Sequence, residues 1–414
     1  MLETPLGFAQ WSARPTADTT WRRPSTHSAR RCAVSDPPQC SNDGRAVLAS
    51  RPRAYPEPEV SESLEDLRRD IDSLDEQLVT LLGQRAKLVQ EIGHRKADTG
   101  IPVFDPGRER DVLARVTAIN PGPYEDDHIQ AIYREVMAAS RSLEEPPRVG
   151  YLGPPHTFSH QAAQQYFGRL ADLTPLGSFR DIFDFVDRSP RVSGVVPIEN
   201  TTSGTIGETL DLFVTRTVFI QAEIQLPVSH NLLATSGSTD WACVYSHPHA
   251  IAQCRGWIER HLGTTPIMEV ASTAEAARRT ADEPHTAAIG PLSAAEAFGL
   301  EVLQQDIQDI ASNRTRFYVI GDKPAARTGR DKMALMVAVH DRVGALHDVL
   351  SCLRDHDLNL SFIQSRPSRL KPDDYIFFLE MMGHPDEEAV QQALRVLGES
   401  TVLTRVLGAW PLSN

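Results

Sequence analysis

The sequence is poor in cysteine, and its cysteines form neither a disulfide framework nor a metal-binding pattern. There are five among 414 residues, and no two are spaced as Cys-x-x-Cys. The tightest histidine pair, His247 and His249, has no cysteine or cluster of carboxylates beside it. Scattered thiols of this kind are typical of a reducing compartment. We therefore expect a cytoplasmic protein without a metal centre.

Long apolar runs and an excess of positive charge are also missing. No apolar stretch approaches the length that crosses a bilayer. Lysine and arginine number 42 against 55 aspartate and glutamate residues, which gives a formal net charge of −13. This balance argues against nucleic acid or an anionic membrane surface as a partner. The length favours two to four folded domains.

The first 60 residues differ in composition from the rest of the chain. They are rich in arginine, serine and proline and lack a sustained hydrophobic period. We expect a disordered N-terminal extension over residues 1–60. Three interpretations of it remain open: a transit peptide, which its Arg- and Ser-rich, acid-poor start resembles, a natural disordered tail, or a start codon placed too far upstream.

Residues 61–145 have the pattern of an all-helical domain. Apolar residues recur at alternating intervals of three and four, at Leu64, Leu67, Ile71, Leu74, Leu78, Leu81, Leu88 and Ile92. This spacing predicts a long amphipathic helix whose apolar face packs on another helix. Arg85 falls in line with that face, and Lys96, eleven residues later, lies on nearly the same side.

A guanidinium on an apolar face is costly unless an anion meets it. On the position of Arg85 alone, two interpretations are open. An Asp or Glu from another helix would neutralise Arg85 inside the protein. A negatively charged ligand would neutralise it in a binding site.

Two further helices complete the helical domain. A break at 99–102 precedes the second, which has Asp105 as a suitable N-cap and Pro106 as its first residue. The third is expected over about 126–144 and ends at a proline linker. Polar residues at helical spacing lie on these helices: Asp105, Arg108 and Glu109 on one, Ser140 and Glu144 on the other. Alone, such spacing is more typical of a solvated helix surface.

Residues 148–322 alternate short apolar strands with helices, the pattern of an α/β domain. Strands are expected at 148–153 and 193–200, each followed by small polar residues and then a helix, and the strand-then-turn pattern is repeated at 242–248 and 286–291. Thr205 and Glu208 predict a capping box. Small polar residues between a strand end and a helix N-terminus favour anion binding.

Residues 332–413 follow the order β-α-β-β-α-β. The strands are expected at ALMVAV, NLSFIQSRPS, DYIFFLEMMG and TVLTRVLGAW, and the helices at GALHDVLSCLRDH and DEEAVQQALRVLG. This order predicts a ferredoxin-like α+β domain.

The helical domain resembles the all-helical chorismate mutases over its whole length, from LEDLRRDID to DPGRERDVL. The resemblance implies three-helix subunits in an intertwined dimer. It implies a binding pocket made of Arg68, Arg85, Lys96, Asp105, Arg108, Glu109, Ser140 and Glu144.

The resemblance also implies a role for each main side chain. Chorismate is a dicarboxylate that rearranges in a pericyclic step, so the enzyme needs to hold it in a compact shape and stabilise developing charge. Arg85 would meet one carboxylate, and Arg68, reaching in from a partner subunit, would meet the other, with Arg108 nearby. Lys96 would donate to the ether oxygen. Glu109 would hold the ring hydroxyl.

Glu144 is expected to be catalytic together with Lys96, at a position that carries glutamine in some chorismate mutases. A glutamine donates to the ether oxygen at any pH, whereas a glutamate donates only when protonated. We therefore expect mutase activity to fall as the pH rises and Glu144 loses its proton. Glu144→Gln should flatten this pH–rate profile. A wild type with a flat profile would leave Glu144 as a solvated residue at a helix end.

Four motifs of the α/β domain, in chain order, resemble those of prephenate dehydratases: VGYLGPPHTFSHQAA, VVPIENTTSGTIGETLDLF, VYSHPHAIAQC and SNRTRF. The resemblance implies a two-lobed, periplasmic-binding-protein-like fold acting on prephenate, the mutase product. Thr315 is the expected catalytic residue, polarising or relaying a proton because its hydroxyl is a poor acid. The residues implied to line the substrate are Glu199, Asn200, Thr201, Ser246, Gln253, Thr315 and Arg316.

Two positions depart from the dehydratase pattern, and one motif has a simpler interpretation. Pro155-His156 stands where Glu-Gly is usual, and Ser203 stands where a glutamate is usual. Both affect turns near the expected pocket mouth. Glu199-Asn200 taken alone would be a strand-end Asx turn.

The segments RVGALHDVL and FIQSRPS resemble the two binding segments of ACT domains fused to prephenate dehydratases. The resemblance implies that phenylalanine binds at a dimer interface as a feedback inhibitor. The implied contacts are Gly344, Ala345, Leu346, Ser365, Arg366 and Pro367. Gln364 replaces the usual glutamate, which removes an anionic partner and predicts weaker sensitivity. A dimerisation module that binds no ligand is the alternative.

The three resemblances together imply a multidomain bifunctional chorismate mutase–prephenate dehydratase that makes phenylpyruvate without a metal or organic cofactor. The expected small molecules are chorismate, prephenate and phenylalanine, and a homodimer or higher even oligomer is expected. One alternative is a monofunctional dehydratase whose helical domain serves dimerisation. Another is a non-catalytic small-molecule sensor. The filled charged positions of the helical domain disfavour the first, and Thr315 would have no use in the second.

Overall fold

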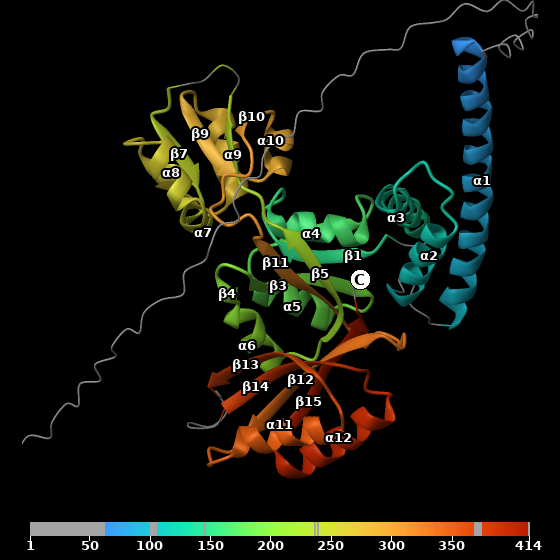
Figure 1. The fold of residues 1–414 in the computed structure, drawn as a ribbon, viewed down its shortest axis with the longest axis vertical. Helices are drawn as coiled ribbons and strands as arrows, with labels where there is room; N and C mark the ends of the chain where they lie inside the picture. Colours follow the sequence, from blue (N-terminus) through green and yellow to red (C-terminus); the bar gives the residue numbers. More distant parts are fainter. Residues whose placement is uncertain are drawn as a thin grey trace, which may run out of the picture. The chain divides into compact units, whose positions relative to one another are not determined.

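The computed structural model describes residues 63–99, 106–143, 146–235, 237, 240–367 and 375–412 (Figure 1). The extension expected over residues 1–60 lies outside this range. In the described part of the chain, no helix has the length and apolar character needed to cross a membrane. The same residues contain no group of three or more His, Cys, Asp or Glu side chains able to hold a metal ion.

Three helices come first in the described chain, as predicted: α1 (Leu64–Thr99), α2 (Pro106–Ala118) and α3 (Asp126–Ser142). The apolar face of α1 is exposed in the single chain, with exposed fractions of 56% for Leu78 and 67% for Leu88. α3 instead buries Met137 and Ala138. An exposed apolar face of this length is typical of a surface that another protein surface covers.

The α/β part has two lobes. We call the first the large lobe, whose sheet order is β5-β11-β3-β1-β2, with β4 on β3. Its strands are β1 (Arg148–Leu152), β2 (Asp172–Leu176), β3 (Val192–Asn200), β4 (Gly204–Thr205), β5 (Phe219–Pro227) and β11 (Arg314–Gly321). Helix α4 (Phe158–Phe167) covers one face, while α5 (Phe179–Arg188) and α6 (Gly207–Thr215) cover the other (Figure 1).

The small lobe has a separate five-stranded sheet with the order β10-β6-β9-β7-β8. Its strands are β6 (Asn231–Ala234), β7 (Cys243–Ser246), β8 (Ile267–Glu269), β9 (Thr286–Gly290) and β10 (Glu301–Gln304), and its helices are α7 (Pro248–Gln253), α8 (Arg255–His261), α9 (Thr273–Asp282) and α10 (Leu292–Phe298). The chain passes between the lobes twice, from β5 to β6 and from β10 to β11. Two crossings between two sheets confirm the expected two-lobed α/β fold.

The capping box predicted for residues 205–208 is wrong. Helix α6 begins at Gly207, and its N-cap, Ile206, makes no side-chain cap hydrogen bond. Thr205 is instead part of β4, where it pairs with Glu199 of β3. Because Thr205 pairs with the sheet, it is not the N-cap of α6.

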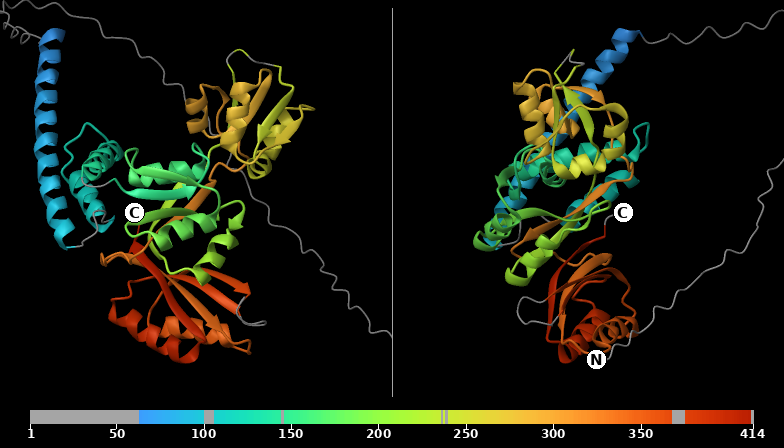
Figure 2. Two further views of the ribbon diagram at one scale, coloured as in Figure 1. Left: turned by 180° about the vertical axis from the view of Figure 1, so that it is seen from behind. Right: turned by 90° about the vertical axis from the view of Figure 1, so that its left-hand side faces the viewer.

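The C-terminal domain has the predicted β-α-β-β-α-β order. Its elements are β12 (Asp331–Val339), α11 (Ala345–Asp355), β13 (Leu360–Pro367), β14 (Tyr375–Met382), α12 (Glu388–Ser400) and β15 (Leu403–Pro411). The strand order β13-β14-β12-β15 is that of a ferredoxin-like sheet. Helices α11 and α12 cover one face (Figure 2). The other face packs against the large lobe through Met336, Phe378 and Trp410.

One backbone contact joins the sheets of the large lobe and the C-terminal domain. Strand β15 pairs with β5 in parallel at a single position, where Gly408 lies opposite Ile220. Gly408 has φ +151°, and a Cβ there would lie 2.2 Å from the Ile220 carbonyl oxygen. Only glycine permits so close a backbone approach. The two domains therefore share a ten-stranded sheet.

Candidate active sites

The first candidate site lies where α1 meets α3. The guanidinium of Arg85 is half-buried and donates through Nη1 to the hydroxyl oxygen of Ser140. Ser140 is buried and itself donates to the Val136 carbonyl oxygen at 2.7 Å. No ion pair of Arg85 occurs among the described residues. Two of the predicted pocket residues, Arg85 and Ser140, are therefore brought together.

The other predicted residues of this site are more dispersed in the single chain. Arg68 and Arg108 are exposed on α1 and α2. Glu109 forms an ion pair with Arg141 of α3, which also donates to the Phe167 carbonyl oxygen at 2.7 Å. Lys96 lies within α1. Asp105 and Glu144 lie outside the described residues.

The second candidate site lies at the ends of β3 and β11 in the large lobe. Thr315 pairs with Asn200 across the two strands. The Asn200 Nδ2 atom donates to Thr315 Oγ1 at 2.9 Å and to Asn313 Oδ1 at 3.0 Å. An amide nitrogen can only donate, so the threonine oxygen is the acceptor and its own proton is left for another partner. The predicted catalytic threonine is thus oriented by the predicted asparagine.

The Asx turn considered for Asn200 is also present. Asn200 Oδ1 accepts from the backbone N–H groups of Thr202 at 3.0 Å and Ser203 at 3.1 Å. The turn and the contact with Thr315 use opposite ends of the same amide. The local turn is therefore what fixes the amide that orients Thr315.

Gln253 of α7 joins this cluster from the small lobe. Its Nε2 atom donates to Thr202 Oγ1 at 2.8 Å, and its Oε1 atom accepts from Asn313 Nδ2 at 3.0 Å. A cavity of about 540 Å³ opens beside it, lined by Thr202, Ser203, His249, Gln253, Asp309 and Asn313 among others. A volume of this size accommodates a small organic acid.

His230 supports the cluster from the first crossing between the lobes and was not predicted. It is buried, and its Nε2 atom lies 2.8 Å from Gln253 Oε1. Burial lowers the pKa of His230, an effect that the hydrogen bond to Gln253 partly opposes, so the ring is neutral at neutral pH. Because the amide oxygen only accepts, Nε2 carries the proton. His230 also packs edge-on against Phe158 of α4, with ring centroids 5.4 Å apart.

Three predicted residues of the dehydratase site lie apart from this cluster: Ser246, Arg316, and Glu199, whose carboxylate accepts from Arg316 Nε at 3.2 Å. Ser246 is fully buried in β7 and donates to the Ile289 carbonyl oxygen at 2.9 Å. Arg316, next to Thr315, makes its described ion pairs with three glutamates. Thr201 does belong to the cluster, since its hydroxyl accepts from the Arg314 backbone N–H at 3.0 Å.

The predicted effector segments lie at the start of α11 and the end of β13. Gly344 is exposed, with φ +83° immediately before α11, and Ala345 is the first residue of that helix. Arg366 makes a two-point ion pair with Asp211 of α6, with Nε–Oδ1 at 2.9 Å and Nη2–Oδ2 at 2.8 Å. One predicted effector residue is therefore tied to the large lobe.

Comparison with known proteins matches all three parts of the chain to protein families. Residues 67–145 match the family model for chorismate mutase type II, residues 149–325 that for prephenate dehydratase, and residues 333–399 that for the ACT domain. A bifunctional chorismate mutase/prephenate dehydratase of Aquifex aeolicus is 40% identical over 355 residues, which cover 84% of this chain and 98% of that protein. This chain belongs to the bifunctional chorismate mutase/prephenate dehydratase family.

Solved structures resemble the dehydratase and ACT parts of this family member. A prephenate dehydratase from Arthrobacter aurescens in complex with L-Phe has a TM-score of 0.60 at 33% identity, covering 64% of this chain and 90% of that one. A chain described as GqqA, a novel type of quorum quenching acylase, has a TM-score of 0.58 at 27% identity, covering 64% and 98%. Because one fold supports different chemistries, the site residues carry the functional argument.

Proposed function

We propose that this protein converts chorismate to prephenate in its helical domain and prephenate to phenylpyruvate, CO₂ and water between the lobes of its α/β domain. The observation that supports the second reaction best is the contact of Asn200 with Thr315 beside the interlobe cavity. We assign the mutase to residues 61–145, the dehydratase to 148–322 and the regulatory ACT domain to 332–413. Its scattered cysteines favour the cytoplasm as its compartment.

The mutase step needs binding and charge stabilisation only. Arg85 would hold one carboxylate of chorismate while Ser140 fixes the guanidinium, and Arg68 of a second subunit would hold the other. Lys96 and Glu144 would donate to the ether oxygen as its bond breaks. Asp105, Arg108 and Glu109 would complete the pocket. Arg141 fixes the carboxylate of Glu109 on α2 in the single chain.

The dehydratase step is driven by formation of an aromatic ring. The electron pair of the bond to the ring carboxylate enters the ring as CO₂ leaves, and the ring hydroxyl departs and takes up a proton as water. Thr315 accepts from Asn200, so its own proton is left for another acceptor, which would be the leaving ring hydroxyl. A hydrogen bond accepted by an O–H group also polarises it. Gln253 and Thr201 would hold the substrate polar groups.

Separate feeding of the two substrates tests this proposal. The purified chain is given chorismate in one assay and prephenate in another, and phenylpyruvate is followed by absorbance. A bifunctional enzyme makes phenylpyruvate from both. A monofunctional dehydratase makes it from prephenate alone, and a sensor makes it from neither.

We also propose that two copies of the chain pair through the exposed apolar face of α1. Leu78→Glu places a charge in that face on each copy, and we expect it to raise the dimer dissociation constant about 10²-fold or more. Mutase activity should be lost as the dimer is lost, because Arg68 acts across subunits. Sedimentation or light scattering measures the mass. Glu76→Gln, an exposed change on the same helix, is the control, and a dimeric, mutase-active L78E would contradict the pairing.

Phenylalanine is proposed as the feedback inhibitor, bound by Gly344, Ala345, Leu346, Ser365, Arg366 and Pro367. The Arg366–Asp211 pair gives the effector segment a direct contact with α6 of the dehydratase part. We expect Asp211→Asn to raise the phenylalanine concentration for half-inhibition about 5- to 10-fold. Asp355→Asn, in an exposed pair of α11, is the control. A wild-type rate that does not change at millimolar phenylalanine would exclude the regulation itself.

A further inference from the structure

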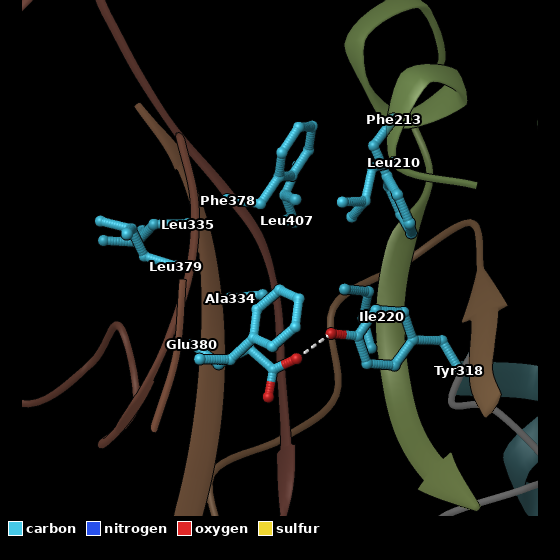
Figure 3. Close-up of a pocket in the computed structure, with 11 residues that line it drawn as sticks. Leu210, Phe213, Ile220, Tyr318, Ala334, Leu335, Phe378, Leu379, Glu380 and Leu407 are labelled. Atoms are coloured by element: carbon cyan, nitrogen blue, oxygen red, sulfur yellow. Dashed lines mark hydrogen bonds between the residues drawn. The ribbon is translucent and has the colours of Figure 1, made fainter. Parts of the chain in front are cut away.

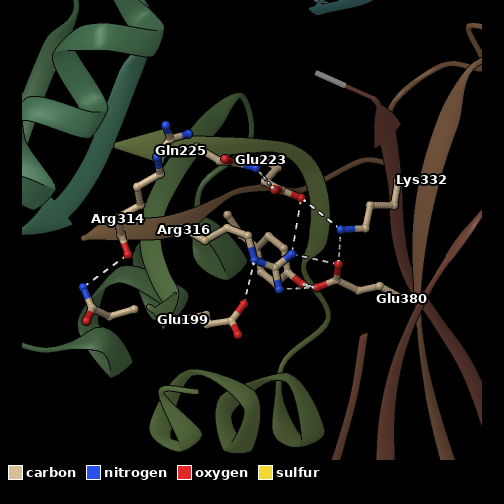
Figure 4. Close-up of polar contacts among 9 residues, drawn as sticks. Glu199, Glu223, Gln225, Arg314, Arg316, Lys332 and Glu380 are labelled. Carbon is tan, nitrogen blue, oxygen red and sulfur yellow. Dashed lines mark hydrogen bonds and ion pairs between the residues drawn. The ribbon is translucent and has the colours of Figure 1, made fainter. Parts of the chain in front are cut away.

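A cluster of charges joins the dehydratase part to the ACT domain, and all of its side chains are largely buried except that of Glu199, which is 39% exposed. It consists of five side chains: Arg316 of β11, Glu199 of β3, Glu223 of β5, Lys332 of β12 and Glu380 of β14. Figure 4 shows them converging from both domains. Glu380 is the most buried, with its side chain 1% exposed. Buried charges of this kind are kept only where partners satisfy them.

Glu380 and Arg316 form the centre of the cluster. Arg316 Nη1 donates to Glu380 Oε2 and Nη2 to Glu380 Oε1, both at 2.8 Å, which is a two-point ion pair. Arg316 Nε donates to Glu199 Oε2 at 3.2 Å on the other side. One guanidinium thus bridges a carboxylate of the ACT domain and a carboxylate of the dehydratase part.

The surroundings of Glu380 make the Arg316 guanidinium the main partner of its carboxylate. Its carboxylate lines a small apolar cavity of about 10 Å³ with Phe213, Phe362 and Leu407, and Tyr318 donates its hydroxyl to it (Figure 3). Burial alone would raise the pKa of Glu380, but Arg316 and Lys332 hold it below the usual 4.5. Glu380 is therefore ionised and bound to Arg316 at neutral pH.

The position of Arg316 sets the position of Thr315. Successive side chains of a strand point to opposite faces, so Thr315 faces Asn200 and the cluster beside the cavity while Arg316 faces the ACT domain. The register of β11 against β3 shifts between Arg316 and Phe317. Such a bulge re-aims the side chains next to it. Along the two strands, Arg316 and Glu199 lie opposite each other, next to the Thr315–Asn200 position on one side and next to the register shift on the other.

We infer that Glu380 of the ACT domain is a positioning residue for the dehydratase reaction, acting through Arg316 on Thr315. Glu380 holds the guanidinium, the guanidinium and Glu199 hold the end of β11, and that end presents the threonine hydroxyl. Arg316 then orients the catalytic strand from behind instead of binding the substrate carboxylate. This inference rests on the proposed dehydratase function.

The test compares both reactions in the full chain carrying Glu380→Gln. The glutamine keeps the shape but cannot supply a second carboxylate oxygen to Arg316. We expect the dehydratase kcat to fall about 10²-fold, as for a small misplacement of a reacting group, while the KM for prephenate stays within about 3-fold. Mutase activity of the same preparation should equal that of the wild type. Glu387→Gln, which alters a partly exposed pair between the ACT domain and Arg327 of the segment before it, should leave both reactions unchanged.

A purely structural role for Glu380 predicts a different pattern. Lys332→Gln removes another charge from the cluster, but Lys332 contacts Glu223 and Glu380 and makes no contact with β11 among the described residues. If the cluster only stabilised the interface, K332Q and E380Q would lower kcat alike. We expect the kcat of K332Q to exceed that of E380Q by at least about 10-fold.

If E380Q does not fold, Arg316→Lys tests instead whether Arg316 positions Thr315 or binds the substrate. Lysine keeps the charge but cannot make the two-point fork to Glu380 together with the Nε bond to Glu199, so kcat should fall with KM unchanged. An R316K variant with raised KM and normal kcat would assign Arg316 to the substrate and overturn the inference. An E380Q variant with wild-type kcat would overturn it as well. A wild type inactive on prephenate would instead refute the proposed function, and the inference with it.

Discussion

Arg85→Ala is expected to lower the kcat/KM of the mutase for chorismate about 10³-fold. Arg85 is half-buried on the apolar face of α1, held by Ser140, and no carboxylate among the described residues neutralises it. Its charge is then available to a substrate carboxylate in surroundings that screen it poorly. Losing one partner of a buried ion pair costs about 3–5 kcal/mol, and each 1.36 kcal/mol is tenfold in rate.

The rate of chorismate loss measures this prediction. Arg85→Lys should lie between the wild type and R85A, because lysine keeps the charge without the two-point geometry of arginine. Arg95→Ala is the matched control on the same helix, since Arg95 is exposed and pairs with Glu91 one turn away. Conversion of prephenate by R85A should equal that of the wild type. Mutase activity in R85A close to the wild-type rate would leave Arg85 as a structural residue.

Thr315→Val is expected to lower the dehydratase kcat about 10²- to 10³-fold. Valine fills nearly the same volume but has no hydroxyl, so the leaving ring hydroxyl loses the group that polarises it or relays a proton to it, while the packing is kept. Positioned proton transfer contributes about 10²- to 10⁴-fold. Asn200 would also lose its acceptor, which leaves one amide hydrogen bond unmade.

Phenylpyruvate formation from prephenate measures the effect of T315V. Thr315→Ser should recover most of the activity, because the serine hydroxyl can still accept from Asn200 and donate to the substrate. The mutase rate of each preparation is the internal control. A T315V enzyme with a wild-type kcat would exclude the threonine as the group that assists the leaving hydroxyl.

Local patterns in the sequence predicted most elements of the fold. The helical spacing of the apolar residues predicted α1, and the order of strands and helices predicted the ferredoxin-like C-terminal domain. Each of these patterns arises from residues that are close together in the sequence. The joining of two sheets at Gly408 depends on a contact with Ile220 from a distant part of the chain, and no local pattern reports it.

Site residues that belong to a sequence motif were predicted. Residues that hold those side chains in place from other parts of the chain were missed. Asn200 and Thr315 were predicted from their motifs, and the structure brings them together. His230 lies outside the motifs, because its role depends on Gln253 from another lobe. Glu380 did have a local signal: it is a lone charge in the apolar strand YIFFLEMM. Like Arg85 on its apolar helix face, a glutamate inside an apolar strand is costly unless a charged partner meets it, so Glu380 indicates a buried ion pair.

Complementation between two variants tests whether one chain carries two separate active centres. R85A and T315V are each supplied with chorismate alone, and then mixed in equal amounts, and phenylpyruvate is followed over time. We expect almost none from either variant by itself and rapid formation in the mixture, because T315V makes the prephenate that R85A consumes. Phenylpyruvate formed at the wild-type rate by either variant alone, or none from the mixture, would contradict two distinct centres at Arg85 and Thr315.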